Sequence, residues 1–272
     1  GRLKLKNVAG KFSFRDDVFK VGVLKAGAGN PIQAQGTISI KESEPIRFTS
    51  RIWAKNSEAA NLIGIFGDTF KKCLDGNLKS LNVDLKGEGG NWGEIRHTLT
   101  GAVSVHLASG EIDNEELKRG TYRLFGLPQK AVPERVSAER DRLGYEQIEG
   151  RFSLKNGVAQ TEKFVYESRQ RRTSVVGMFD LGKNTMDAIM GVAPLPGLDK
   201  FLTKIPVVGK IITGGDEESL VKNYYSVKGP FADPEITPVP FTSLGKKVMG
   251  IFQGILQAPA EIFPFSELEV TN

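Results

Sequence analysis

The feature that most constrains the fold of this chain is a short pattern that recurs along it. A glycine is followed by alternating apolar and polar residues and then by a turn, at 36–40, 101–110, 150–157 and 177–182. Alternation with a period of two is typical of a strand that has one buried and one solvated face. The pattern therefore predicts a mainly β fold, built as a long curled antiparallel β-meander.

The apolar residues of these repeats share one face of their predicted strands, and polar residues such as Ser104 and His106 take the other. Turn signals follow the strands at Ser109-Gly110, Asn156-Gly157 and 182–184, and each predicts a hairpin. The shared apolar face can line an open groove or form the core of a closed sandwich or barrel. The predicted lining residues are Ile38, Ile40, Val103, Val105, Leu107, Phe152, Leu154, Phe179 and Leu181.

Helical patterns interrupt the strands in four places. Apolar residues recur at helical spacing in 58–74, more weakly in 115–125, and in the Pro- and Gly-rich stretch 194–214. The strongest pattern is 242–257, where Lys246 and Lys247 lie opposite a wide apolar arc, which predicts an amphipathic C-terminal helix.

The apolar arc of 242–257 must be covered by something. The helix can pack on the sheet, or it can lie on a membrane surface with its lysines toward anionic headgroups. Burying the arc is worth roughly 10 kcal/mol before entropy, against about 1 kcal/mol for each lysine at a membrane. We therefore predict that the helix docks on the sheet as a cap over the groove. The predicted cap or membrane-contact residues are Leu244, Val248, Ile251, Phe252 and Ile255.

The composition offers little material for catalysis or metal binding. The single cysteine, Cys73, excludes an internal disulfide, and two histidines cannot supply a zinc site. No serine lies in a G-x-S-x-G turn, and 177–184 departs from a phosphate-binding loop at Asn184. We therefore expect no enzymatic activity, no metal and no cofactor.

Charge and hydropathy narrow the class of partner. The net charge of +5 is spread thinly, and only 169–172 and 246–247 are dense in cations, so we do not expect nucleic-acid binding. No apolar run approaches the length of about 20 residues that a membrane-spanning helix needs. The chain begins at Gly1 without a leader, and we expect it to be a piece of a larger protein.

The chain is predicted to be one elongated domain over 1–272. Its most polar stretch, 127–149, is predicted to be an exposed loop. The stretch 229–240 contains Pro230, Pro234, Pro238 and Pro240, and it is predicted to be an extended arm at an edge of the sheet, because proline cannot donate to a central ladder.

The order of these patterns resembles the C-terminal region of the AsmA-like family of bacterial envelope proteins. The resemblance covers about 75–260 and rests on an ordered set: the strand-like stretches 76–87, 99–110, 150–157 and 177–187, an apolar Pro- and Gly-rich stretch at 192–215, and Tyr225-Ser-Val-Lys-Gly229-Pro230. It implies a periplasmic β-groove domain of an inner-membrane-anchored protein, whose anchor is absent from this chain.

The resemblance also implies a function. A family member of this kind carries phospholipid acyl chains in an apolar groove between the inner and outer membranes, and so takes part in outer-membrane lipid homeostasis. The expected partners are phospholipid and a membrane surface. An alternative is a scaffold or assembly factor for outer-membrane proteins, which would bind unfolded strands at the sheet edge along 229–240.

Overall fold

The computed structural model describes residues 8–27, 29–59, 75–112, 143–169, 171–194, 223–231 and 233–257. Within these residues only the backbone is described for Leu143, Pro194, Phe241 and 253–257. Of the helical stretches predicted at 58–74, 115–125 and 194–214, residues 60–74, 115–125 and 195–214 lie outside the described residues, whereas Glu58 and Pro194 each end a strand.

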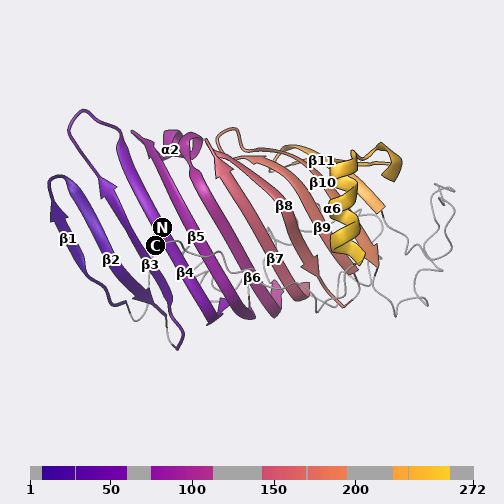
Figure 1. Ribbon diagram of the computed structural model, residues 1–272, viewed down its shortest axis with the longest axis horizontal. Coiled ribbons are helices and arrows are strands. Elements are labelled where there is room, and N and C mark those ends of the chain that lie inside the picture. Colours follow the sequence, from indigo (N-terminus) through magenta and orange to yellow (C-terminus); the bar gives the residue numbers. More distant parts are fainter. Residues whose placement is uncertain are drawn as a thin grey trace.

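The described strands form one antiparallel sheet of twelve strands in strictly sequential order (Figure 1). The first and last strands do not pair with each other, so the sheet is open. The predicted β-meander is therefore confirmed. The strands are β1 (Phe12–Arg15), β2 (Val18–Ala26), β3 (Ile32–Ser39), β4 (Ile46–Glu58), β5 (Asn77–Gly89), β6 (Thr100–Ile112), β7 (Leu143–Lys155), β8 (Val158–Glu167), β9 (Arg171–Asp180), β10 (Thr185–Pro194), β11 (Asn223–Pro230) and β12 (Glu235–Pro238).

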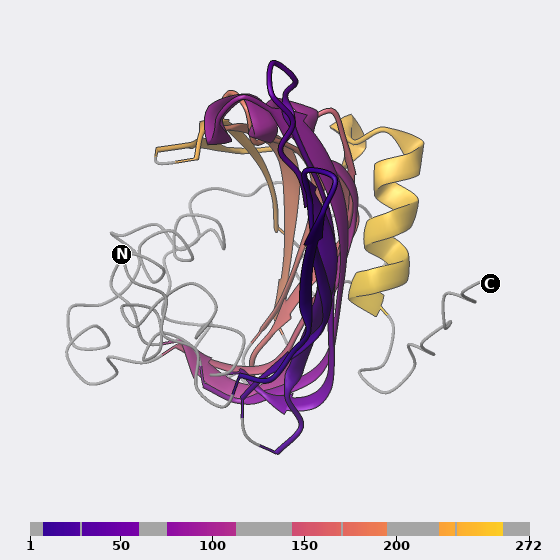
Figure 2. The same cartoon turned by 90° about the vertical axis from the view of Figure 1, so that its left-hand side faces the viewer.

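The strands bend strongly along their length, so that the sheet has a concave and a convex face (Figure 2). Two helices and a short 3-10 turn accompany it in the described part: α2 (Trp92–Thr98), η2 (Phe241–Ser243) and α6 (Lys246–Gln257). α6 stands against the convex face, and α2 lies at one end of the strands (Figure 2). The C-terminal helix predicted over 242–257 is confirmed, with its regular part beginning at Lys246.

Two of the three predicted hairpins are confirmed. Asn156 and Gly157 join β7 to β8 with φ angles of 49° and 75°, the left-handed pair that a tight two-residue hairpin requires. Asn184, with a φ of 55°, ends the turn between β9 and β10. In that turn the Asp180 carboxylate accepts a hydrogen bond from the backbone N–H of Lys183 at 2.9 Å.

The hairpin predicted at Ser109-Gly110 is wrong, because β6 continues to Ile112 and pairs with β7 throughout. Position 110 requires glycine because other atoms lie too close for a side chain, and not because the chain turns there. A Cβ atom there would lie 2.0 Å from the Asp75 carbonyl oxygen and 2.4 Å from the Tyr145 hydroxyl. That hydroxyl donates a hydrogen bond to the same carbonyl at 2.5 Å.

The loop predicted over 127–149 is wrong over 143–149, which form the first half of β7, and 127–142 lie outside the described residues. In the described part of this segment, the charged side chains of Glu146 and Glu149 form ion pairs. Lys163 contacts the carboxylate of Glu149 at 2.7 Å, while Tyr145 and Ile148 are buried in the main core.

Helix α2 was not predicted. It begins at Asn91, whose side chain accepts a hydrogen bond from the backbone N–H of Glu94 at 3.1 Å. The Glu94 carboxylate in turn accepts from the backbone N–H of Gly90 at 2.8 Å. An Asn followed three residues later by Glu is a helix-start signal, but this helix is too short to show apolar periodicity.

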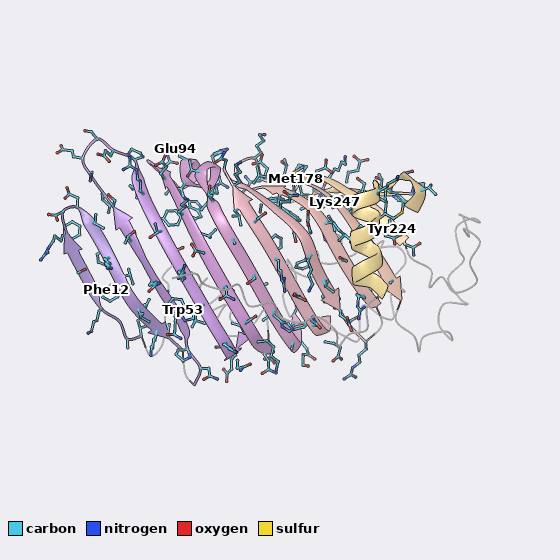
Figure 3. The ribbon with its side chains drawn as sticks, viewed as in Figure 1. Phe12, Trp53, Glu94, Met178, Tyr224 and Lys247 are labelled. Atoms are coloured by element: carbon cyan, nitrogen blue, oxygen red, sulfur yellow. The ribbon has the colours of Figure 1, made fainter. Side chains whose placement is uncertain are left out.

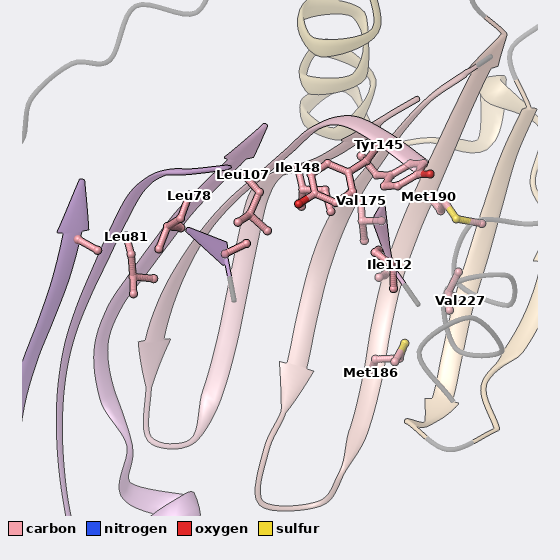
Figure 4. Close-up of a cluster of buried hydrophobic side chains, with 14 of the residues drawn as sticks. Leu78, Leu81, Leu107, Ile112, Tyr145, Ile148, Val175, Met186, Met190 and Val227 are labelled. Atoms are coloured by element: carbon pink, nitrogen blue, oxygen red, sulfur yellow. The ribbon is translucent and has the colours of Figure 1, made fainter. Parts of the chain in front are cut away.

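Three clusters of apolar side chains hold these elements together. The largest lies on the concave face and draws buried residues from β3 to β11, including Leu78, Leu107 and Met190 (Figure 4). A second lies between α6 and the convex face, and a third lies beneath α2. In the described residues the sheet thus has a buried apolar core on its concave face along most of its length, and on its convex face the apolar cluster lies beneath α6.

Candidate functional site

The candidate site is the concave face of the sheet. The pairing register aligns its side chains into rows that cross successive strands at about 4.8 Å per strand. One row runs unbroken from β4 to β12, a distance of roughly 38 Å at that spacing. Its members are Ala54, Leu81, Val105, Gly150, Phe164, Val175, Met190, Tyr225 and Pro238.

The residues predicted to line a groove come together on this face. A second row contains Leu154 and Phe179, and Val103 pairs with Phe152 between the rows. Some of the side chains that the prediction omitted belong to strands outside the glycine repeats, as in Leu81 and Val83 of β5 or Met186 and Met190 of β10, and others, such as Ile148 and Val175, precede a repeat on the same strand. The same period-two alternation in those strands would have identified them.

The concave face stays apolar toward the β1 edge, where its side chains are exposed. Phe14, Phe19, Ile38 and Phe48 are successive partners across β1 to β4 on the concave side. Phe14 is 65% exposed, Phe12 56% and Ile38 36%, whereas the concave core between β5 and β11 is buried. Ile40, predicted as a lining residue, follows the end of β3 and is 54% exposed.

The glycines that open the sequence repeats lie on the concave side as well. Gly101 is the clearest case, since its φ of +145° and its contacts exclude a side chain. A Cβ atom there would lie 1.9 Å from the backbone oxygen of Asp84 on β5. Glycine at such positions lets neighbouring backbones approach closely on the inner side of a bend. The repeat therefore marks the curvature of the sheet as well as its strands.

The predicted cap on the groove is wrong, because α6 packs on the convex face. Phe252 is fully buried against Tyr224, with ring centroids 5.3 Å apart, and Leu244 is buried in the same cluster. Val248 and Ile251 pack there too, while the Ile255 side chain lies outside the described side chains.

The sheet residues beneath α6 explain this placement. Val176, Ile189 and Tyr224 alternate along their strands with Val175, Met190 and Tyr225, which face the concave side. Strands β9 to β11 are therefore apolar on both faces, and the convex patch offers the helix a site to cover. Lys247 also forms an ion pair with Glu162 of β8, and Figure 3 labels it on α6.

The concave face is closed at one end of the strands by α2. Ile95 and Leu99 are buried there against Leu154 and Ala159, and Phe152 and Phe179 pack on the same cluster. These two phenylalanine rings meet edge to face with centroids 6.1 Å apart. The short helix thus adds apolar side chains to the concave face and shields that end of it from water.

The convex face is polar away from α6. Arg47 pairs with Glu88 and Arg51 with Asp84 across β4 and β5, at 3.2 and 2.9 Å. Farther along, His106 lies opposite Glu149 in the register, and burial lowers the pKa of His106 against the opposing attraction of Glu149. The two faces therefore differ in chemistry over most of the sheet.

Within the described residues, no group of His, Cys, Asp or Glu side chains is arranged to hold a metal ion. No helix of the described part is long and apolar enough to cross a bilayer. Cys73 lies outside the described residues.

No family model matches this chain, and the searches of the curated proteins and of the solved structures found no significant match.

Proposed function

We propose that this chain is a non-enzymatic lipid-binding module that holds phospholipid acyl chains along its concave face. The observation that carries the proposal is the continuous apolar row from β4 to β12 on an open, curved sheet. Its length of roughly 38 Å exceeds the ~15 Å that the acyl chains of one leaflet occupy in a bilayer. The row is therefore long enough for an acyl chain to lie across the strands, and this face is buried between β5 and β11 and exposed toward β1.

The energetics favour such a ligand. Each CH₂ group removed from water contributes about 0.8 kcal/mol, so burying about ten of them contributes roughly 8 kcal/mol before ordering costs. A headgroup could remain in solvent at an open edge, which requires no headgroup pocket. The exposed aromatic and aliphatic side chains near β1, such as Phe14 and Ile38, are the natural place for a chain to enter.

The resemblance to AsmA-like proteins agrees with this proposal and extends it. On that basis the module would work in the periplasm, as part of a protein anchored in the inner membrane, and would carry phospholipid toward the outer membrane. Its partners would then be phospholipid and, transiently, a membrane surface.

Lipid binding can be tested with the purified chain. The protein would be freed of bound lipid, incubated with dioleoyl phosphatidylglycerol, repurified and examined by native mass spectrometry. We expect a protein–lipid complex that Ile38→Glu weakens, because a carboxylate on the concave face would have to be desolvated beside the acyl chain.

Ser39→Glu is the matched control, since Ser39 is the next residue and faces the convex side opposite Arg47. The proposal requires the two variants to differ. Absence of lipid from the wild-type protein, or equal lipid retention by both variants, would count against it.

A further inference from the structure

In the described part of the structure, the β1 edge of the sheet is unprotected. All four residues of β1 are exposed, and nothing among the described residues pairs with its outer side. Phe12 is labelled on this outermost strand in Figure 3. An edge that leaves its backbone groups unpaired is a template for another strand, which native proteins usually block.

The register identifies the backbone groups that point outward. The Lys11 carbonyl accepts a hydrogen bond from the N–H of Gly22 at 2.8 Å. In an antiparallel ladder the bonded pairs alternate, so Ser13 and Arg15 also bond to β2. The N–H and C=O groups of Phe12 and Phe14 therefore face away from the sheet.

The opposite edge is blocked. The N–H of Val239 donates to the Tyr224 carbonyl at 2.9 Å, and Thr237 occupies the next bonded position of the same register. Ile236 and Pro238 accordingly face outward, and Pro238 has no N–H to offer. Added strands are thus disfavoured at β12, the edge along 229–240 that the sequence suggested, and favoured at β1.

The side chains near β1 define the chemistry of a fitting strand. Phe12 and Phe14 present exposed rings on the concave side. Lys11, Arg15 and Lys20 are exposed, and by strand alternation they project to the convex side. None of the three forms an ion pair with a described residue, in contrast to the paired arginines of β4.

We propose that the β1 edge binds an extended strand of another polypeptide, with apolar residues on the concave side and acidic residues on the convex side. The partner's backbone would bond to Phe12 and Phe14, and its carboxylates would lie opposite Lys11 and Arg15. Opposite charges across a strand pair stabilise it, and like charges destabilise it.

The same charges argue against a second copy as the partner. A two-fold pairing that uses only the outward-facing residues of β1 would place Phe12 opposite the copy's Phe14 and therefore Lys11 opposite its Arg15. Each dimer would contain that cation–cation pair twice, with no carboxylate on the strand to offset it. This inference concerns the sheet edge and does not depend on lipid binding to the concave face.

The edge can be tested with a short fluorescein-labelled peptide that alternates valine and glutamate, using fluorescence anisotropy on the full chain. We expect saturable binding, and weaker binding of a peptide with lysine in place of glutamate. Arg15→Glu should weaken the acidic peptide about fivefold and strengthen the lysine peptide.

A comparison of Phe14→Pro with Phe14→Ala distinguishes the contribution of the backbone N–H to peptide binding from that of the aromatic ring. Both remove the aromatic side chain, but only proline removes the outward N–H. Proline should therefore bind the acidic peptide about tenfold more weakly than alanine, with equal thermal stability. Equal binding by these variants, or equal binding of both peptides, would overturn the inference. So would a dimer in sedimentation that Phe14→Pro dissociates, which would assign the edge to a second copy.

Discussion

The packing of α6 on the convex face leads to a strong prediction for Phe252. Its side chain is fully buried among Val176, Ala193, Tyr224 and Leu244. Truncating a buried phenylalanine to alanine costs about 3–5 kcal/mol, from lost transfer free energy and from the cavity that remains. In this protein the lost stability cannot exceed the free energy with which α6 docks on the sheet. Once the helix has left the sheet, the cavity no longer exists.

The prediction therefore has two parts. In Phe252→Ala, backbone amides of 246–257 should exchange with solvent faster by the factor that corresponds to the lost docking free energy, which is about 100-fold for a loss of 3 kcal/mol. Amides of β4 to β7, which are remote from α6, should keep their protection. Lys246→Ala, at an exposed position of the same helix, is the control and should change neither.

The result that would refute this reasoning is equally specific. If Phe252→Ala leaves the exchange of α6 within a few-fold of the wild type, the helix is not held by this side chain. If the variant instead exposes the concave face and binds an apolar dye there, α6 would be acting as the cap that the sequence suggested.

Three further predictions follow from individual contacts. Gly250→Ala should stabilise α6 by up to about 1 kcal/mol in urea unfolding, because alanine favours helix and its Cβ would meet no atom within 4 Å; a loss of stability would contradict the open surface at that position. Gly101→Ala should cost at least about 2 kcal/mol, because its Cβ would overlap the backbone oxygen of Asp84; an unchanged urea midpoint would show that the strands do not approach so closely. Burial raises the pKa of Tyr145 from 10.0 to about 12, so its ionisation favours the unfolded chain. The free energy of unfolding should fall as pH rises from 10 toward 12 and fall less in Tyr145→Phe, whereas identical pH profiles would contradict this pKa.

The sequence predicts the strands well because their alternation is local. Most side chains that face the concave core are two residues from the next, apart from the register shifts at bulges, and the hairpin at Asn156-Gly157 requires a left-handed conformation that these residues tolerate. It does not predict that Ser109-Gly110 continues a strand, since the reason lies in Asp75 and Tyr145, which are distant in sequence.

The face that α6 covers could have been inferred from neighbouring residues. The pairs Val175-Val176, Ile189-Met190 and Tyr224-Tyr225 break strict alternation, which indicates strands buried on both sides. The amphipathic pattern of 242–257 shows that the helix needs an apolar surface, but it contains no information on which surface of the sheet is vacant. The sequence predicts which residues face the concave side. The order in which these residues lie across the strands follows only from the pairing register of the structure.

The central claim is that lipid binds to the concave face of the sheet. The most direct test is to compare photo-crosslinking to lipid from residues that are neighbours in sequence but face opposite sides of the sheet. Benzoylphenylalanine would replace Ile38 or Val83, which face the concave side, and Ser39 or Asp84, which follow them and face the convex side. The protein would be illuminated with phosphatidylglycerol and its adducts identified by mass spectrometry. The account predicts lipid adducts at Ile38 and Val83 and few at Ser39 and Asp84; equal labelling of both faces, or labelling confined to the convex face, would contradict it.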